Sequence, residues 1–309
     1  MALAPIALFV YNRPRHTQET IAALRRNLLA AESDLIVFCD GGKTDEDWQR
    51  VNEVRRFVKS VEGFKSVTVD ESAFNLGLGR SIIDGITKVT AIHGRGIILE
   101  DDEILAPRFL DFMNAGLSLY ENDPAVAAIN GYLYPVKGTL PETFFLRGEN
   151  VWGFGLWKRS WDIFEPDGAK LLRMLEERGL TSRFSLDNTA PFKAILEAQI
   201  RGENDSWAVR WQAAAFLRNM LTLFPNKSLV RNIGYDGTGR HCGVSSVYDT
   251  DIYEGEIKVE RIELVECKRA RKALVAWHRE AFKSGRRHRL RRWVGGTRLG
   301  RVVRALRGR

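Results

Sequence analysis

The sequence predicts an α/β protein in which helices flank a mainly parallel sheet. Short apolar segments alternate with segments of helical periodicity over the first hundred residues, and polar residues follow the apolar segments where these end. No apolar stretch is long enough to cross a membrane, including the N-terminal one that ends by Tyr11 without a basic leader. The 309 residues suffice for one large domain or two small ones.

The alternation can be followed along the chain. The expected strands are 5–10, 34–39, 67–69 and 96–99, and the expected helices between them are 17–29, 48–61 and 75–93. In the second of these helices the valines and Phe57 recur every three or four residues and form one apolar stripe. Because strands and helices take turns, the pattern predicts a doubly wound parallel sheet.

Three consecutive carboxylates, Glu100, Asp101 and Asp102, follow the fourth strand. Side chains alternate along a strand, so we expect Glu100 and Asp102 on one side and Asp101 on the other, at the edge where open α/β sheets bind ligands. Such a cluster calls for a hard divalent cation, Mg2+ or Mn2+, that keeps positions open for phosphate oxygens. The alternative is a solvated acidic loop before a helix near Pro107.

Polar residues also follow the earlier strands. Asn12 and Arg13 come after the first and Asp40 after the second, so a nucleotide laid across the strand ends would meet them in turn. Each has a plainer alternative: Arg13 as a surface residue and Asp40 as a turn former before two glycines. Arg80 follows a glycine pair and is either a cation for phosphate or base, or half of a surface ion pair.

Aromatic residues and glycines alternate in the second half, at Trp152, Phe154 and Trp157. Aromatic faces stack on the C–H faces of sugars, and glycine allows the backbone to approach a ligand, so this segment and Trp207 are candidates for stacking on an acceptor or sugar. Core aromatics at a strand or turn would produce the same pattern. The segment 202–207 opens a further helix, for which Asp205 or Ser206 could serve as the N-cap.

Two further features lie near the C-terminus. Residues 232–243 contain four glycines, and Arg240 and His241 lie near the end of this segment. The composition is typical of a loop that closes on a diphosphate, although a lone His is also often structural.

Residues 268–309 carry 16 Lys or Arg and one acidic residue, a net charge of +15, whereas residues 1–267 carry 31 basic and 38 acidic residues, a net charge of −7. Apolar residues spaced at helical intervals among these cations predict amphipathic helices on an anionic membrane surface. Nucleic acid is the competing partner and is disfavoured, because no nucleic-acid motif is present.

Cysteine usage points to a reducing compartment. The chain has three cysteines, at positions 39, 242 and 267, an odd number without CxxC spacing. Neither a disulfide framework nor a zinc site is therefore expected.

The motifs VYNR at 10–13, DGG at 40–42 and NLGLGR at 75–80 resemble those of family 2 inverting glycosyltransferases of the GT-A fold. The segment ILEDDEILAPRF at 98–109 is similar to the EDD metal motif, with its apolar and Pro-Phe sequel, of the inverting, metal-dependent N-acetylglucosaminyltransferases that begin complex N-glycan branches. In motif order the resemblance covers residues 5–245. It is specific at the acidic motif and looser elsewhere.

The resemblance implies a role for each candidate residue. Asp102 would bind the metal, with His241 as an additional ligand. Glu100 and Asp101 would contact the donor's sugar and ribose, Arg13 and Asp40 would flank its base, and Arg80 and Arg240 would contact the nucleotide sugar. Inverting transfer needs a carboxylate that accepts the acceptor hydroxyl's proton, and related families place an Asp before a Trp at the start of such a helix, which matches Asp205, with Glu203 in reserve.

The sequence thus predicts a GT-A domain over 1–267, with a nucleotide-sugar half at 1–105 and an acceptor half at 106–267, and a basic amphipathic helical tail over 268–309. The expected activity is metal-dependent, inverting transfer of a hexosyl or N-acetylhexosaminyl group from a UDP-sugar to a glycan or lipid-linked acceptor. The expected location is cytoplasmic, peripheral on the inner face of the membrane, in cell-surface polysaccharide synthesis. The alternatives are a sugar nucleotidyltransferase, which would need a glycine-rich loop after the first strand, and a non-catalytic binding or scaffold protein of the same fold.

Overall fold

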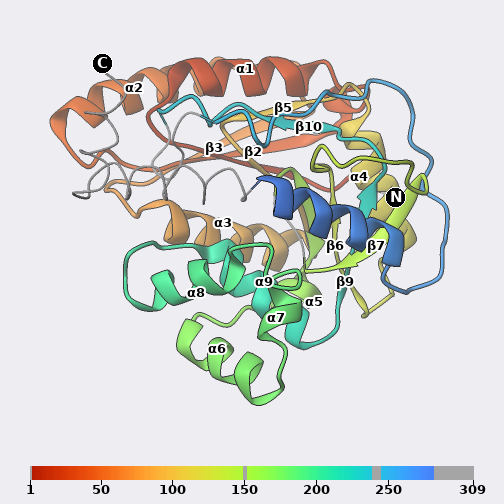
Figure 1. The fold of residues 1–309 in the computed structure, drawn as a ribbon. Coiled ribbons are helices and arrows are strands. Elements are labelled where there is room, and N and C mark those ends of the chain that lie inside the picture. The colour runs from red at the N-terminus through yellow and green to blue at the C-terminus, as the bar shows by residue number, and fades with distance from the viewer. Residues whose placement is uncertain (1, 149–151, 239–244, 282–309) are drawn as a thin grey trace, which may run out of the picture.

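A computed structural model describes residues 2–148, 152–238 and 245–281. Within them, a central mixed sheet has eight strands in the order β3-β2-β1-β4-β8-β6-β9-β7. These strands are β1 (Ile6–Val10), β2 (Asp34–Cys39), β3 (Ser66–Glu71), β4 (Arg95–Glu100), β6 (Val126–Asn130), β7 (Thr143–Arg147), β8 (Phe154–Trp157) and β9 (Leu221–Pro225). The predicted α/β class with helices on both sides of the sheet is confirmed (Figure 1).

The first four strands form the parallel half of the sheet. β1 pairs in parallel with β2 on one side and with β4 on the other, and β2 pairs in parallel with β3. The chain winds outward from β1 to β3 and then returns to the other side of β1, so the strand order reverses between β1 and β4. In open α/β sheets, this reversal creates a crevice at the carboxyl ends of the two strands, where ligands bind.

The helices between these strands begin slightly earlier or later than periodicity predicts. They are α1 (Pro14–Arg25), α2 (Asp45–Lys59) and α3 (Leu78–His93). α1 starts at a proline, whose fixed φ suits the first helical position. α2 starts after Thr44, whose hydroxyl accepts the amide hydrogen of Asp47 at 3.2 Å. Local capping chemistry thus sets boundaries that the apolar stripe leaves open.

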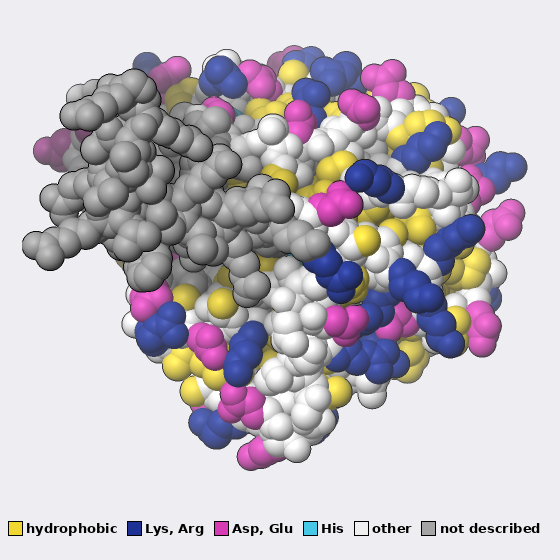
Figure 2. Space-filling model, viewed as in Figure 1, with side chains coloured by type: hydrophobic (Ala, Val, Ile, Leu, Met, Phe, Trp, Pro, Cys, Tyr) yellow, Lys and Arg dark blue, Asp and Glu magenta, His cyan; other side chains and the backbone are white. Residues whose placement is uncertain are grey.

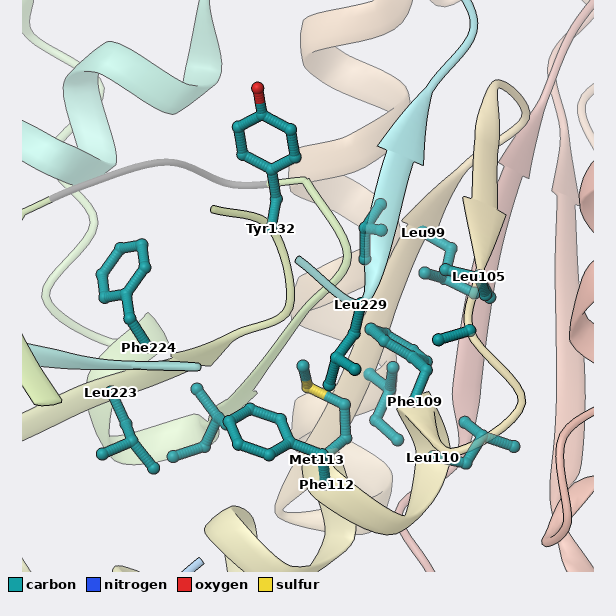
Figure 3. Close-up of a cluster of buried hydrophobic side chains, with 14 of the residues drawn as sticks. Leu99, Leu105, Phe109, Leu110, Phe112, Met113, Tyr132, Leu223, Phe224 and Leu229 are labelled. Carbon is teal, nitrogen blue, oxygen red and sulfur yellow. The ribbon is translucent and has the colours of Figure 1, made fainter. Parts of the chain in front are cut away.

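Two helical layers cover the sheet (Figure 1). One buried cluster joins α1, α2 and α4 (Phe109–Leu119) to the sheet, and another joins α3, α5 (Lys158–Trp161) and α9 (Trp207–Leu217) to the other face. In Figure 3, Phe109, Leu110 and Met113 of α4 lie with Leu105 and Leu229 in the first cluster. A third cluster packs α6 (Gly168–Glu177), α7 (Thr181–Phe184) and α8 (Phe192–Ile200) against α9.

The antiparallel half of the sheet begins where β8 pairs with β4, with Ile98 opposite Phe154. β8 also pairs with β6, so it lies inside the sheet and its side chains face both helical layers. A separate two-stranded sheet pairs β5 (Glu103–Leu105) with β10 (Val230–Asn232), placing Ile104 opposite Arg231. This pairing brings a segment from late in the chain to the end of β4.

Residues 268–281 are helical but are not a separable tail, so the expected boundary at 267/268 is wrong for this part of the chain. Ala270, Leu274 and Val275 are buried in the same cluster as α1 and α4. Arg271 binds both carboxylate oxygens of Asp187, at 2.7 and 2.8 Å. Leu274 and Val275, which were predicted to reach a membrane, therefore fill the core instead, whereas Trp277 is half-buried. The rest of the predicted tail, 282–309, lies outside the described residues.

Charges on the described surface are mixed in sign. On the face in Figure 2, Lys and Arg side chains lie interspersed with Asp and Glu rather than in a single-sign patch. Within the described ranges, no helix combines the length and apolar character needed to cross a membrane.

Candidate active site

Arg13 links the ends of β1 and β4. Its Nη2 donates to Asp102 Oδ2 at 2.8 Å and forms a shorter contact with Asp101 Oδ1, while its Nε donates to Asp101 Oδ2 at 3.3 Å. The Arg13 side chain is 18% exposed, so this ion pair is largely shielded from water. The two carboxylates raise the pKa of the guanidinium above its usual value despite the opposing effect of burial. The residues expected at the switch point are thus brought together.

The expected alternation across the acidic stretch is wrong. β4 ends at Glu100, and residues 101–102 form a turn before β5, so Asp101 and Asp102 both face Arg13. Burial and the charges of the two aspartates raise the pKa of Glu100 to about 8. Burial also raises the pKa of Asp101, although the Arg13 guanidinium opposes this shift, so one guanidinium faces two neighbouring carboxyl groups at the end of β4.

Glu103, which is not among the site residues expected from the sequence, is fully buried. Its carboxyl group accepts the amide hydrogens of Gly153 at 3.0 Å and Glu100 at 3.3 Å. Burial, followed by the charges of Glu100 and Asp102, raises the pKa of Glu103 well above its usual value. Glu103 thus fixes the aromatic-glycine segment to the end of β4. In the sequence, Glu103 could have been noticed as the fourth acidic residue in a row, directly before the apolar residues Ile104 and Leu105.

The segment after β10 encloses Asp102. Asn232 Nδ2 donates to Asp102 Oδ1 at 3.2 Å, and the Ile233 amide donates to the Asp102 carbonyl at 2.8 Å. A Cβ on Gly234 would lie 2.1 Å from Asp102 Oδ2, so only glycine allows this approach. His16 of α1, also missed, lies with Nε2 3.1 Å from Asp236 Oδ2 and ties the same segment to α1.

The donor set around Asp102 fits a hard divalent cation. Each carboxylate oxygen of Asp102 accepts one hydrogen bond among those described, whereas such an oxygen can accept two, so lone pairs remain for a cation. The described residues do not place three or more His, Cys, Asp or Glu side chains together as a complete metal cage. Mg2+ and similar ions often use one or two carboxylates together with substrate phosphates and water. The carboxylate of Asp102 is therefore sufficient as the ligand from the protein when phosphate and water supply the other ligands.

Asp40 anchors the glycine-rich turn before α3. Oδ1 accepts the amide hydrogens of Gly41 and Leu76, each at 2.8 Å, and Oδ2 accepts those of the Gly77 backbone and the Asn75 side chain, each at 3.0 Å. Asp40 lies at the carboxyl end of β2 as expected, but its carboxylate already has four protein partners. Its described contacts thus position the turn 75–77.

Asp205 lies across from this turn. Its Oδ2 is 3.5 Å from the Gly79 amide nitrogen, in the first turn of α3, where the helix dipole favours a negative charge. The N-cap of α9 is Ser206, whose hydroxyl accepts the amide hydrogen of Val209 at 3.3 Å. The sequence left open whether Asp205 or Ser206 is the N-cap of this helix. In the structure the N-cap is Ser206, so Asp205 is not needed for that role.

Asp205, Glu203 and Arg80 line one pocket of about 710 Å3, between the N-terminal turn of α3 and the loop before α9. Arg80 forms an exposed ion pair with Asp84 at 3.3 Å, which is the plainer of its two predicted roles. Glu203 is exposed and binds Arg201 through both oxygens, which lowers the pKa of Glu203. Asp205 is thus the half-buried carboxylate of the pocket and Glu203 the solvated one.

Most of the aromatic residues predicted to stack on a sugar are core residues, and that prediction is wrong for three of them. Phe154, Trp157 and Trp207 are 1%, 3% and 4% exposed. Phe154 stacks on Trp207, with ring centroids 5.9 Å apart, and Trp157 donates its indole hydrogen to the Leu117 carbonyl. Trp152 precedes β8 and is half-buried, so it alone of the four presents part of its ring to the surface. Arg240 and His241 lie outside the described residues.

The fold and the site together define an α/β protein with a charged, carboxylate-rich site at the β1/β4 switch point. No protein-family model matches the chain, and no curated protein matches it. The chain is similar to solved structures of S. aureus TarS, at 14% identity over 45% of this chain and 23% of that one (TM-score 0.31), and of TarS 1–349 in complex with UDP, at 13% identity over 74% and 60% (TM-score 0.40). It is also similar to the mannosyltransferase PcManGT from Pyrobaculum calidifontis in complex with GDP-Man and Mn2+, at 15% identity over 69% and 73% (TM-score 0.34). The chain thus spans under a quarter of the first of these structures.

Proposed function

We propose that this protein is an inverting, metal-dependent glycosyltransferase of the GT-A fold. It transfers a hexosyl or N-acetylhexosaminyl group from a nucleotide-diphosphate sugar, expected to be UDP-linked, to a hydroxyl of a glycan or lipid-linked acceptor. The observation that carries the proposal is the meeting of Arg13 with Asp101 and Asp102 at the point where the strand order reverses. This is the place in an open α/β sheet where a nucleotide binds.

The residues at the switch point bind and orient the donor. Asp102 would hold a divalent cation, Mn2+ or Mg2+, and such an ion would supply charge stabilisation to a leaving diphosphate. Arg13 keeps Asp101 and Asp102 together and limits their repulsion while the donor is absent. Glu100, at the end of β4, contacts the sugar of the donor. Asp40 contributes by holding the turn 75–77 in place.

Asp205 acts as the general base on the acceptor side. It lines the 710 Å3 pocket, which has room for a sugar-sized acceptor, and the N-cap of α9 is Ser206 rather than Asp205. Accepting the proton of the acceptor hydroxyl makes that oxygen a stronger nucleophile for in-line attack on the anomeric carbon. Arg240 and His241 remain candidates for the donor side, and Glu203 remains the reserve base.

The composition of residues 282–309 supports a location of the reaction at a membrane surface. Residues 282–309 carry 11 Lys or Arg and no acidic residue, together with Trp293 and several aliphatic residues. Juxtamembrane cations gain about 1 kcal/mol each near an anionic leaflet. A cytoplasmic protein held at the inner face of the membrane in this way would meet lipid-linked or cell-surface glycan precursors.

The proposal is tested by hydrolysis of nucleotide sugars with and without Mn2+, together with the melting temperature under the same conditions. We expect one donor to be hydrolysed slowly and to raise the melting temperature only when the cation is present, since a ligand at a hundred times its Kd adds about 2.7 kcal/mol of stability. Asp102→Asn should lose both effects while melting near the wild-type temperature. Glu19→Gln, an exposed carboxylate of α1, is the matched control. Donor binding by Asp102→Asn with undiminished Mn2+ dependence would contradict the metal assignment.

A further inference from the structure

Four half-buried aromatic rings contact one another beside the candidate active site. We call them the aromatic platform: Trp152, Tyr235, Tyr248 and Trp277. Successive ring centroids lie 5.8 Å apart for Trp152 and Tyr235, 4.7 Å for Tyr235 and Tyr248, and 5.7 Å for Tyr248 and Trp277. Trp152, Trp277 and the pair of Tyr235 and Tyr248 come from three distant parts of the sequence, so the platform is a product of the tertiary fold.

A second layer of rings supports the platform from below. Tyr132 is fully buried and meets Trp152 edge to face at 4.8 Å, and its hydroxyl donates to the Tyr248 carbonyl at 2.8 Å. Tyr134, 7% exposed, lies with its ring 4.5 Å from that of Trp277. Because both lower rings are buried and Tyr132 is hydrogen-bonded to the Tyr248 backbone, the upper rings are held in place and lose little conformational entropy on binding a ligand.

The platform begins at the carboxylate cluster. Tyr235 directly follows Gly234, whose backbone packs against Asp102, and Trp152 precedes Gly153, whose amide is held by Glu103. The other end of the platform is Trp277, in the helix formed by 268–281, which runs beside β7 (Figure 1). A ligand lying on the platform would therefore extend from the site of sugar transfer toward this helix.

We infer that the aromatic platform binds an acceptor glycan of at least two pyranose rings, so that the substrate is an existing oligosaccharide rather than a single sugar. This inference rests on the proposed function. The platform consists of Trp and Tyr, rings with a flat apolar face and a polar edge, which match sugars that present C–H faces to the protein and hydroxyls to water. A lipid chain would match aliphatic side chains or Phe, and none of the four platform members is of that kind. The rings are tilted against one another by 35 to 87°, so a glycan of two or more sugars would meet ring faces and ring edges in turn.

Saturation-transfer NMR tests the inference directly, with irradiation of the aromatic protons. The probes are neutral oligosaccharides of two to six units from the gluco, galacto, manno and N-acetylglucosamino series, their monosaccharides, and decyl phosphate as a lipid-like control. We expect transfer to at least one oligosaccharide series and much less to its monosaccharide. Trp277→Leu and Tyr248→Leu should each weaken that binding by about two- to tenfold. Tyr253→Leu, a half-buried tyrosine under the Lys227 ammonium, should leave it unchanged.

Donor hydrolysis in the same variants separates this inference from the proposed function, since hydrolysis needs no acceptor glycan. Retained hydrolysis with weaker oligosaccharide binding supports the platform. Oligosaccharide binding unchanged in Trp277→Leu and Tyr248→Leu, or saturation transfer to decyl phosphate alone, would overturn it while leaving the proposed function standing. If Trp277→Leu melts well below the wild type, Tyr235→Leu provides the same test from a loop position.

Discussion

Arg13 and Asp101 are separated by 88 positions in the sequence, yet they form a two-point ion pair across the ends of β1 and β4. Asp102 shares the same guanidinium. One cation therefore holds two neighbouring carboxylates together at the crevice of the sheet. Acidic side chains thus outnumber basic ones at the place where a divalent cation is proposed to bind.

Arg13→Met is expected to lower the free energy of unfolding by about 3 kcal/mol, because it leaves two largely buried carboxylates without their partner. Adding Asp101→Asn should recover part of this loss, since one of the two charges is then removed. Urea unfolding measures both values. Arg15→Met is the control, because that side chain is 71% exposed. Equal stability of the Arg13 and Arg15 variants would contradict this account.

Asp205→Asn should preserve donor affinity and abolish transfer, because loss of a general base lowers the rate of the chemical step and not ground-state binding. Ser206→Ala should do the reverse, lowering stability by about 1 kcal/mol through loss of the N-cap while retaining most activity. Steady-state kinetics and denaturant unfolding on the two neighbours separate the roles. Unchanged turnover in Asp205→Asn would exclude it as the base.

Asp40→Ala should lower stability by about 2 kcal/mol, since it leaves amide donors in the turn 75–77 without an acceptor. Donor affinity should fall in parallel, because the turn shifts. Chemical denaturation and donor-induced thermal shifts provide the two values. A loss of donor binding at full stability would instead identify Asp40 as a direct contact of the nucleotide.

Two truncations should behave differently. A chain ending at residue 281 should melt like the full chain but lose binding to anionic vesicles, whereas one ending at 267 should be strongly destabilised. The second removes Leu274 and Val275, whose burial contributes about 1.5–3 kcal/mol each, and the ion pair of Arg271 with Asp187. Vesicle binding by the full chain should require anionic lipid and weaken with salt. Equal binding to neutral vesicles, or salt-sensitive binding to nucleic acid alone, would contradict the membrane role.

Acid should destabilise the protein through His278. Burial lowers the pKa of this imidazole to about 4, whereas in the unfolded chain it titrates near 6.5. Between these values the unfolded state binds the proton preferentially, so stability falls as the pH drops from 6.5 toward 4. The loss at pH 5 is about 2 kcal/mol relative to pH 7.5. The midpoint of urea unfolding should fall less between pH 7.5 and pH 5 in His278→Asn than in the wild type. An equal fall in both proteins would show that other groups cause the loss of stability.

Local patterns were sufficient to predict the parallel half of the sheet and its helices. The spacing of apolar residues around Val51 and Ile82 is typical of a helix, and the apolar run that ends at Leu99 is typical of a buried strand. The polar residues that follow β1 and β4 can be read directly from the order of the chain. Arg13, Asp101 and Asp102 could be placed at one edge for this reason, because the carboxyl ends of parallel strands meet there.

Features that depend on distant pairing could not be predicted. Asp101 turns toward Arg13 because β5 leaves β4 to pair with β10, and the Asp102–Asn232 contact spans 130 residues. Phe154 and Trp157 are buried because β8 lies between β4 and β6, which no local pattern of rings and glycines reveals. The assignment of the cap to Ser206 and not to Asp205 depends on backbone angles that differ between adjacent residues.

The position of β8 also affects how the protein forms during synthesis. β4 is complete once Glu100 has been made, but its second neighbour, β8, ends only at Trp157. At about 5–20 residues per second, the ribosome needs roughly 3–10 s to make the intervening chain. During that time the nascent parallel sheet has an open, apolar edge that could pair with another chain. Slow translation at this stage prolongs the exposure, so overproduction at low temperature should benefit from chaperones that cover strand edges.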